Sequence, residues 1–386
     1  MLDSRVISSV DRFNTIRQTL KAAYVARDQA IDLLVLGTIC GEHVLLLGPS
    51  GTAKTDLVTR YAQLITARKF SYLLTRFTEP TELFGPVDIS ELGKGRYRVR
   101  TDNMLPEAEI AFLDEIFHAG SAVLNTLLSL LNERKFHNGP DYQPVPLVTM
   151  VGAANELPDD PALTPIADRF LLRHLVEPVA DADIPRLIEL GWDHRWRREP
   201  GTAAEALATI DDLAALNAAL YQVRLKPVLE AYTMILTDLR RSGLRISDRR
   251  AVRCLKLVAG AALLRCSDEA RTRDLWPLGH VWSAPADRAL VQDAVQQIVQ
   301  DDGGMVVTGF RSPHEVLTEA RSLAARSGLD DLSRLQQLGR LRHELRRHGD
   351  DAAVAAIDEI IRPFLEDPTR QPDPPGGPSQ EGSADV

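Results

Sequence analysis

Apolar runs and helical periods alternate along the first half of the chain. The runs that predict buried strands of a parallel sheet are 44–47, 70–76, 110–113 and 148–155. The segments whose apolar residues recur at a helical period are 15–40, 55–68 and 120–133. Strands that alternate with helices in this way predict an α/β fold, in which a parallel sheet is flanked by helices.

The second half of the chain carries few strand signals. Its helical segments are 181–195, 203–223, 225–242, 248–266, 286–300 and 312–365. The end of the chain is rich in Pro, Gly, Ser and Asp and poor in apolar residues, which predicts disorder. We therefore expect an α/β core at 1–178, a helical domain at 179–303, a helical C-terminal extension at 304–366 and a disordered tail at 367–386.

Two polar segments predict hairpins within the first half. Residues 85–104 carry Gly93 and Gly95 at a turn between β-prone segments, so we expect a hairpin that is inserted into the core. Residues 134–146 predict a second, polar hairpin, centred on the Asn-Gly-Pro turn at 138–140.

The sequence VLLLGPSGTAKT at 44–55 joins a buried strand to a helix through a glycine-rich turn. Such a turn lets successive backbone amides face inward and form an anion cradle at a helix N-terminus. The pattern predicts that Lys54 binds the β- and γ-phosphates of a triphosphate and that the Thr55 hydroxyl binds Mg²⁺. An ordinary strand-to-helix turn is the alternative. The predicted phosphate-binding residues are Gly48, Pro49, Ser50, Gly51, Thr52, Ala53, Lys54 and Thr55.

One loop position departs from the G-x-x-x-x-G-K-[ST] pattern, because Ala53 stands where the last glycine is expected. Alanine adds only a methyl group and adopts helical backbone angles readily, so we expect the loop to form. We also expect a negative φ at Ala53, since positive φ is disfavoured for a residue with a side chain.

A second apolar run ends in two acids, as IAFLDE at 110–115. The strand would carry both acids to the carboxyl edge of the sheet, where ligands bind in open α/β folds. We expect Asp114 to hold the hydration shell of Mg²⁺ opposite Thr55, and Glu115 to polarise the attacking water. A strand that ends in a solvated acidic turn is the alternative.

Five stretches in this order resemble the MoxR family of AAA+ ATPases and, within it, the RavA-like branch. They are GEHVLLLGPSGTAKT (41–55), TRFTEPTELFGPVDI (75–89), LPEAEIAFLDEIFHAGSAVLNTLLSLLNERKFHNG (105–139), GAANELP (152–158) and ISDRR (246–250). That branch uses the same GxAK form of the loop, so Ala53 agrees with the resemblance.

The resemblance implies an AAA+ P-loop core followed by an α-helical lid, with 85–104 as an insert that faces a central pore. It implies Mg²⁺-dependent hydrolysis of ATP by an oligomer, in a hexameric ring with each ATP between two subunits. It also implies chaperone-like remodelling or maturation of a protein partner, often one with a von Willebrand factor A domain.

The resemblance also suggests roles for a neutral amide and an arginine. Asn155 corresponds to sensor 1, which bonds the γ-phosphate and the lytic water. The alternative is that Asn155 only caps the turn into 156–158. Arg169 corresponds to the arginine finger, which reaches a neighbouring subunit's γ-phosphate. Arg173 is the rival for that role, and a salt bridge with Asp168 or Glu177 is the alternative explanation of Arg169.

A further arginine opens one of the predicted lid helices. The sequence predicts Ser247 or Asp248 as the N-cap, so Arg249 lies in the first turn of the helix, where a cation opposes the helix dipole. A bound phosphate would explain this placement, as at the sensor 2 residue of the family. Arg250 is the alternate, and a basic surface is the simpler explanation.

Composition fits this hypothesis. The 386 residues include 45 basic and 54 acidic side chains, for a net charge of −9, which disfavours broad nucleic-acid binding. We expect the basic stretch at 340–349 to be a solvated face.

The chain shows no membrane-spanning run, and its cysteines are scattered, so we expect a cytoplasmic protein. A DNA-handling motor and a non-hydrolysing nucleotide switch that acts as a scaffold are the rival functions.

Overall fold

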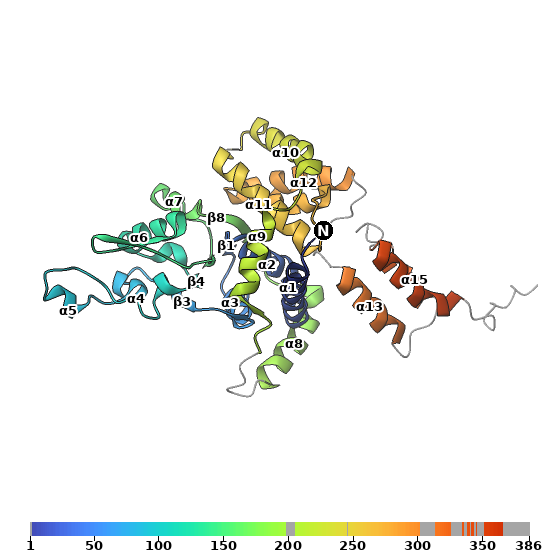
Figure 1. Cartoon of the computed structure of the whole chain (residues 1–386), viewed down its shortest axis with the longest axis horizontal. Coiled ribbons are helices and arrows are strands. Elements are labelled where there is room, and N and C mark those ends of the chain that lie inside the picture. Colours follow the sequence, from blue (N-terminus) through green and yellow to red (C-terminus); the bar gives the residue numbers. More distant parts are fainter. Residues whose placement is uncertain are drawn as a thin grey trace, which may run out of the picture. The chain divides into compact units, whose positions relative to one another are not determined.

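The computed structural model describes most of the chain. The described residues are 2–197, 205–244, 246–301, 313–325 and 351–365, with several positions between 334 and 345. The chain forms two compact units, Met1–Phe310 and Arg311–Val386, and the first holds the sheet and the larger apolar core (Figure 1). The predicted disordered tail at 367–386 lies outside the described residues, as does most of the basic stretch at 340–349.

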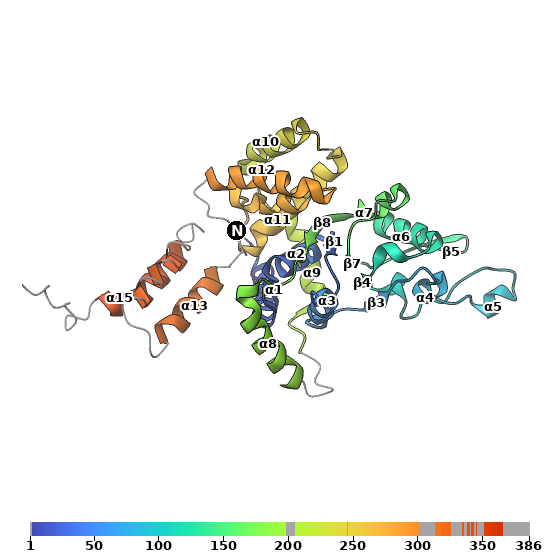
Figure 2. The same ribbon diagram turned by 180° about the vertical axis from the view of Figure 1, so that it is seen from behind.

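A parallel sheet with the strand order β3-β4-β7-β1-β8 lies at the centre of the first unit, and Figure 2 shows the strand labels in that sequence. Its strands are β1 (His43–Leu47), β3 (Lys69–Leu73), β4 (Ile110–Asp114), β7 (Thr149–Ala154) and β8 (Phe170–Leu175). Each predicted apolar run overlaps one of these strands, and β1 and β7 are buried at every position. Because β7 lies between β1 and β4, the carboxyl ends of the three strands meet at one edge.

Helices flank this sheet, as predicted. They are α1 (Ser4–Ala23), α2 (Asp28–Cys40), α3 (Lys54–Gln63), α4 (Pro80–Phe84), α6 (Ser121–Glu133) and α7 (Thr164–Ala167). Helix α2 contacts β1 and β8, whereas α3 contacts β4 and β7. Helix α2 is buried at every position from Ala30 to Cys40, which makes it the most enclosed helix named here.

The prediction of a single helix at 15–40 is wrong, because two helices occupy this segment. Helix α1 closes with a hydrogen bond from the Tyr24 amide to the Leu20 carbonyl, and α2 opens after Arg27. Between them Ala26 has a φ of 54°, which no right-handed helix allows. Both helices pack apolar residues into the same core, so the apolar pattern continues across the break and conceals it in the sequence.

The insert at 85–104 differs from the predicted hairpin. Its two arms meet at one antiparallel bridge, between Val87 and Val99, and the short helix α5 (Ile89–Leu92) occupies the tip. Gly95 has a φ of 76° and turns the chain back after this helix, so the predicted turn is present. The strand pairing is therefore confined to the base of the insert among the described residues.

Two small sheets lie outside the central one. They pair β2 (Ile65–Thr66) with β9 (Ala208–Thr209) and β5 (Lys135–Asn138) with β6 (Asp141–Pro144). The second of these is the predicted polar hairpin at 134–146, and Gly139 in its turn has a φ of 68°. Helix α3 ends at Gln63, before the predicted end at 68, because Ile65 already pairs with Ala208 in the sheet of β2 and β9.

The rest of the first unit is helical. Its elements are α8 (Ile184–Arg197), α9 (Ile210–Leu220), α10 (Leu229–Arg241), α11 (Asp248–Leu264), η6 (Thr272–His280) and α12 (Arg288–Asp301). We call α10, α11, η6 and α12 the lid helices; they lie together above the sheet in Figure 1, and α11 contacts α2 and α9. In the second unit, α13 (Pro313–Ala325) and α15 (Asp351–Leu365) pack around an apolar cluster of their own.

Among the described helices, none combines the length and the apolar character that crossing a membrane would require. The predicted division of the first unit at residue 178 stays a prediction, because core and lid helices share one apolar cluster.

Candidate nucleotide-binding site

The loop between β1 and α3 has an unusual backbone. Gly48 has a φ of 141° and Gly51 a φ of 84°, which is the region that glycine reaches most easily. A Cβ atom on Gly48 would lie 2.2 Å from the Val176 carbonyl oxygen, so this position has no room for a side chain. At Gly51 a Cβ would meet nothing within 4 Å, so the loop tip is open on its outer side.

The expectation of a negative φ at Ala53 is wrong. Ala53 has a φ of 64° and forms the N-cap of α3, where its carbonyl accepts a hydrogen bond from the Leu57 amide at 2.9 Å. A left-handed alanine costs about 1–2 kcal/mol relative to the right-handed form, and the surrounding loop must offset that cost. Ala53 therefore adopts a left-handed conformation of the kind that glycine reaches without this cost.

Lys54 lies at the start of α3 and is buried. Its Nζ donates to the Gly48 carbonyl at 2.5 Å and to the Pro49 carbonyl at 2.9 Å. Burial lowers the pKa of Lys54, while the charges of Asp114 and Glu115 oppose that shift. The ammonium is thus already desolvated and held within the loop, where a phosphate oxygen can replace a carbonyl as its partner.

The carboxyl ends of β1 and β4 bring Thr55 and Asp114 together. The Thr55 hydroxyl donates to Asp114 Oδ2 at 2.6 Å, although the two residues are far apart in sequence. A hydroxyl and a carboxylate are hard oxygen ligands of the kind that Mg²⁺ takes, together with waters and phosphate oxygens. This oxygen pair beside the cradle of the loop fits a nucleotide with bound Mg²⁺.

Glu115 and Asn155 also meet at this edge. Glu115 has a φ of 52°, a left-handed conformation that is costly for a residue with a side chain. Asn155 Nδ2 donates to Glu115 Oε1 at 3.1 Å, and the Ser50 hydroxyl donates to Asn155 Oδ1 at 3.3 Å. We call the group formed by Lys54, Thr55, Asp114, Glu115 and Asn155 the loop edge. These five residues, which the sequence predicted as parts of one site, lie together in the structure.

A cavity of about 1170 Å³ opens beside the loop. Its walls include Tyr24 and Arg27 from the break between α1 and α2, and Ile184, Ile188 and Trp192 from α8. Arg27 is buried, and its Nε donates to the Thr52 carbonyl at 3.1 Å. Sequence analysis missed these residues. The helical period concealed the break that places Arg27 beside the loop, and the apolar stripe of α8 is one that any packed helix would show.

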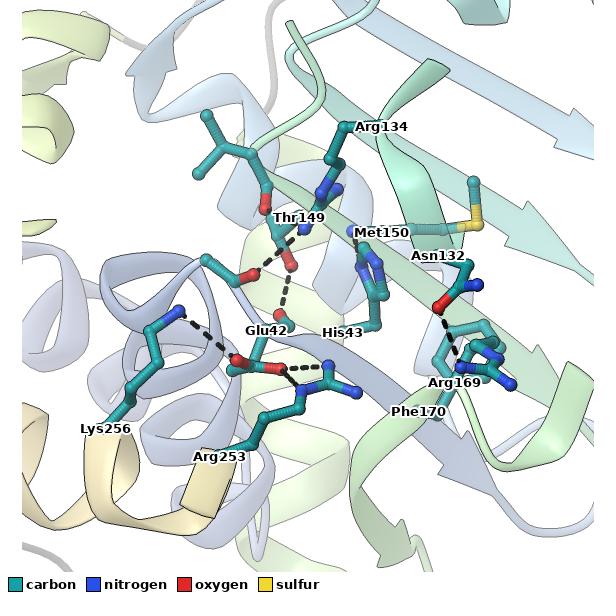
Figure 3. Close-up of polar contacts among 12 residues, drawn as sticks. Glu42, His43, Asn132, Arg134, Thr149, Met150, Arg169, Phe170, Arg253 and Lys256 are labelled. Atoms are coloured by element: carbon teal, nitrogen blue, oxygen red, sulfur yellow. Dashed lines mark hydrogen bonds and ion pairs between the residues drawn. The ribbon is translucent and has the colours of Figure 1, made fainter. Parts of the chain in front are cut away.

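The predicted arginines lie elsewhere. Arg169 Nη1 donates to Asn132 Oδ1 at 3.0 Å (Figure 3). Burial lowers the pKa of Arg169, and the charges of Arg249 and Arg253 lower it further. The charge of Asp168 opposes this shift. We call Arg169, Arg249 and Arg253 the arginine surface. Neither Arg169 nor Arg249 lines the cavity beside the loop.

The two rival arginines differ from their neighbours in burial. Arg173 is 1% exposed, and its guanidinium donates to the carbonyls of Ala167 and Ser283 and to Asp168. Arg250 is 7% exposed and donates to the Ser283 hydroxyl at 2.8 Å. Burial lowers the pKa of Arg173 to about 10. Arg173 of β8 thus fastens the core to the segment after η6, and Arg250 of α11 bonds the same segment and lies 3.8 Å from Asp168, whereas Arg249 is exposed.

Glu42 anchors the arginine surface from below. It is 3% exposed and lies directly before β1. Figure 3 shows Arg253 and Lys256 of α11 both reaching Glu42, with Arg253 Nε at 3.1 Å and Lys256 Nζ at 3.3 Å from its oxygens. Removing one partner of such a buried ion pair is costly because the other charge stays buried. Ser247, one of the two predicted candidates, is the N-cap of this helix.

Comparison with known proteins agrees with this geometry. Residues 11–218, more than half of the chain, match a family described as the MoxR domain in the MoxR-vWA-beta-propeller ternary systems, and residues 220–295 match the AAA lid domain.

Individual relatives show the same relationship. An uncharacterised protein of Methanocaldococcus jannaschii is 36% identical over 273 residues, which are 70% of this chain and 71% of that protein. Chaperone MoxR1 of Mycobacterium tuberculosis is 27% identical over 40% of this chain and 41% of its own length. A crystal structure from Cytophaga hutchinsonii, of a protein described as a candidate ATPase, has the same fold, with a TM-score of 0.61 at 16% identity over 77% of this chain and 96% of that one. The chain therefore belongs to the MoxR family of AAA+ ATPases.

Proposed function

We propose that this chain hydrolyses ATP to ADP and phosphate with Mg²⁺, and that it does so as a subunit of an oligomer. The observation that carries the proposal is the loop edge, where a buried ammonium, an oxygen pair for a metal ion and a carboxylate held by an amide lie together. Three strands and the start of α3 supply these groups, and an ordinary glycine-rich turn would not require them to converge.

Each group of the loop edge has one task in this proposal. The loop amides and Lys54 hold the triphosphate, while Thr55 and Asp114 would hold Mg²⁺, which supplies positive charge to the phosphate oxygens when bound. Glu115 orients the attacking water and draws its proton, and Asn155 holds Glu115 and a γ-phosphate oxygen. This set makes a non-hydrolysing switch the weaker hypothesis.

We further propose that the arginine surface serves the nucleotide of a neighbouring subunit, in a hexameric ring. Arg169 would act as the finger and Arg249 as the sensor 2 residue, both across the boundary. The charge of Arg249 acts on Arg169, and neither residue lines the chain's own cavity, which supports this assignment. Arg173 and Arg250 are weaker candidates, because their donors already bond within the chain.

The protein acted upon is proposed from the relatives. The matching family is described by systems that combine MoxR with a vWA protein and a β-propeller, and one relative is named a chaperone. We therefore propose chaperone-like remodelling of a partner with a von Willebrand factor A domain. The RavA-like branch and the cytoplasmic location stay predictions. A DNA-handling motor is disfavoured by the net charge of −9.

The test is the release of phosphate by the wild-type protein and by Glu115→Gln. Wild type should turn over ATP only with Mg²⁺. The variant should bind ATP with an affinity near that of wild type and lose turnover by about 10²-fold or more, because an amide cannot accept the proton of the attacking water. With ATP present, it should also accumulate as a larger species in light scattering. Near-normal phosphate release by Glu115→Gln would refute the role of this residue.

A further inference from the structure

The amide of Asn155 lies between the phosphate loop and the carboxylate of Glu115. Its oxygen accepts from the Ser50 hydroxyl at 3.3 Å, and its nitrogen donates to Glu115 Oε1 at 3.1 Å. The backbone of the same residue is held separately, since the Gly48 amide donates to the Asn155 carbonyl at 3.0 Å. The main chain is thus fixed to the loop, and the side chain is left to be oriented by its two hydrogen bonds.

Those two hydrogen bonds are satisfied by one orientation of the amide. An ionised carboxylate only accepts hydrogen bonds, whereas a serine hydroxyl can donate one. If the amide were reversed, its oxygen would face the Glu115 carboxylate and its NH₂ group would face Ser50. The reversed amide would lose the charge-assisted bond and place two acceptors against each other. The carboxylate of Glu115 therefore sets which way the amide faces, and the Ser50 hydroxyl holds the amide oxygen in that orientation, so that one N–H group of Asn155 is bonded to Glu115 and the second is left for another acceptor.

We propose that Ser50 is a positioning residue, which fixes the amide of Asn155 so that it can hold Glu115 and still offer its second N–H group to the reacting phosphate. The inference rests on the proposed hydrolysis of ATP. Because Ser50 belongs to the loop that holds the phosphates, the chain Ser50–Asn155–Glu115 also connects occupancy of that loop with the placement of the carboxylate.

The test compares Ser50→Ala with Ser50→Thr, which keeps the hydroxyl. One hydrogen bond of this kind contributes about 0.5–1.5 kcal/mol, which corresponds to about a two- to tenfold change in rate. We expect Ser50→Ala to lower kcat by that factor with KM for ATP changed less than about twofold, and Ser50→Thr to restore most of the loss.

The decisive measurement repeats Ser50→Ala in an Asn155→Ala background, with single-turnover kinetics to resolve the slow reaction. If Ser50 acts through Asn155, the double variant should be no slower than Asn155→Ala alone. The matched control is Thr52→Ala, because the Thr52 hydroxyl donates to the Pro49 carbonyl at 2.9 Å and is not part of this chain of bonds. Its effect should be the same with and without Asn155.

The outcomes separate the two claims. A Ser50→Ala loss that persists in full without Asn155 overturns the inference, since Ser50 would then act on the nucleotide itself. An unchanged kcat in Ser50→Ala overturns it as well. A wild-type protein with no turnover contradicts the proposed function, and the inference falls with it.

Discussion

The loop edge and the arginine surface both gather charged groups, but they balance the charges differently. At the loop edge, Lys54 is offset by two carboxylates and bonded to two carbonyls of its own chain. At the arginine surface, the hydrogen-bond partner of Arg169 is the neutral amide of Asn132, and the charges beside it are Arg249 and Arg253. The nearby carboxylate of Asp168 already accepts from Arg173.

This difference shows which part of the site one chain can complete. The loop edge has a cation, an oxygen pair and a carboxylate in place within a single chain. At the arginine surface, Arg253 is paired with Glu42, whereas Arg169 bonds a neutral amide and Arg249 is exposed. In the proposed function, a neighbouring subunit's triphosphate is the anion that these two arginines receive. Substitutions at either region test this difference, and their expected effects on turnover, binding and stability differ in size.

The largest effect is expected at the arginine surface. Arg169→Ala should keep the affinity for ATP within a few-fold and lower turnover by about 10³-fold, the lower end of the range for arginine fingers elsewhere. Mixing this variant with Glu115→Gln should restore activity, because a boundary with an intact Glu115 on one side and an intact Arg169 on the other forms a complete site. Phosphate release after subunit exchange is the measurement.

The matched control for this experiment is Arg173→Ala. Because Arg173 bonds within its own chain, its removal should lower the thermal stability of the protein, and mixing should not rescue what activity is lost. If exchange is demonstrated by fluorescence and the Arg169→Ala mixture stays inactive, the arginine surface does not act across a boundary.

A smaller effect is expected at the loop edge, in binding. Lys54→Ala removes the ammonium that we propose binds the nucleotide phosphates, so the affinity for a fluorescent ADP should fall by about 100-fold or more. Lys135→Ala, which alters an exposed lysine on the polar hairpin, should bind like wild type. Wild-type affinity in Lys54→Ala would mean that the loop does not bind phosphate.

The smallest effect concerns the contact between β8 and η6, which we call the seam. His174 of β8 and His280 of η6 lie with ring centroids 5.6 Å apart. Burial lowers the pKa of His174 to about 3 and that of His280 to about 4. An unfolded histidine has a pKa of about 6.5, so the unfolded state binds more protons below that pH, and stability should fall as the pH drops from 6.5 towards 4.

The size of that loss is about 1–2 kcal/mol for each imidazole by pH 5. Urea unfolding at pH 7 and pH 5 measures it, and the fluorescence of Trp276, which packs against His280, reports on the seam. A variant with His174→Gln and His280→Gln should lose less stability on acidification. His137→Gln, at an exposed position, should keep the wild-type pH dependence. Equal pH dependence in all three proteins would contradict the assignment.

The sequence predicted the elements of this site better than its contacts. Strands, the loop and the acids of β4 follow from local patterns, because an apolar run and a glycine-rich turn carry their meaning within a few residues. The φ of Ala53 and the break at Ala26 do not, since closing the loop and packing α1 against α2 impose them on residues without a local preference. Ser50 and Asn155 meet only because β1 and β7 are neighbours in the sheet.

The paired arginines show the same limit. Arg169 and Arg173, or Arg249 and Arg250, are alike in sequence pattern and in charge. The members of each pair differ in burial, because Arg173 and Arg250 are the two that reach Ser283, in the segment after η6. That contact joins segments distant in the chain, and no periodicity in a single sequence encodes it.

The burial of Glu42 has a mechanical consequence. Glu42 ties α11 to the first residue before β1, and the phosphate loop begins directly after the last residue of the same strand. At about 3.3 Å per residue, the five residues of β1 span roughly 16 Å. Both faces of this strand are packed in the core, so local bending would disrupt that packing. If β1 tilts as a unit when the loop of the proposed function binds phosphate, Glu42 moves with it, and its ion pairs transmit that movement to α11.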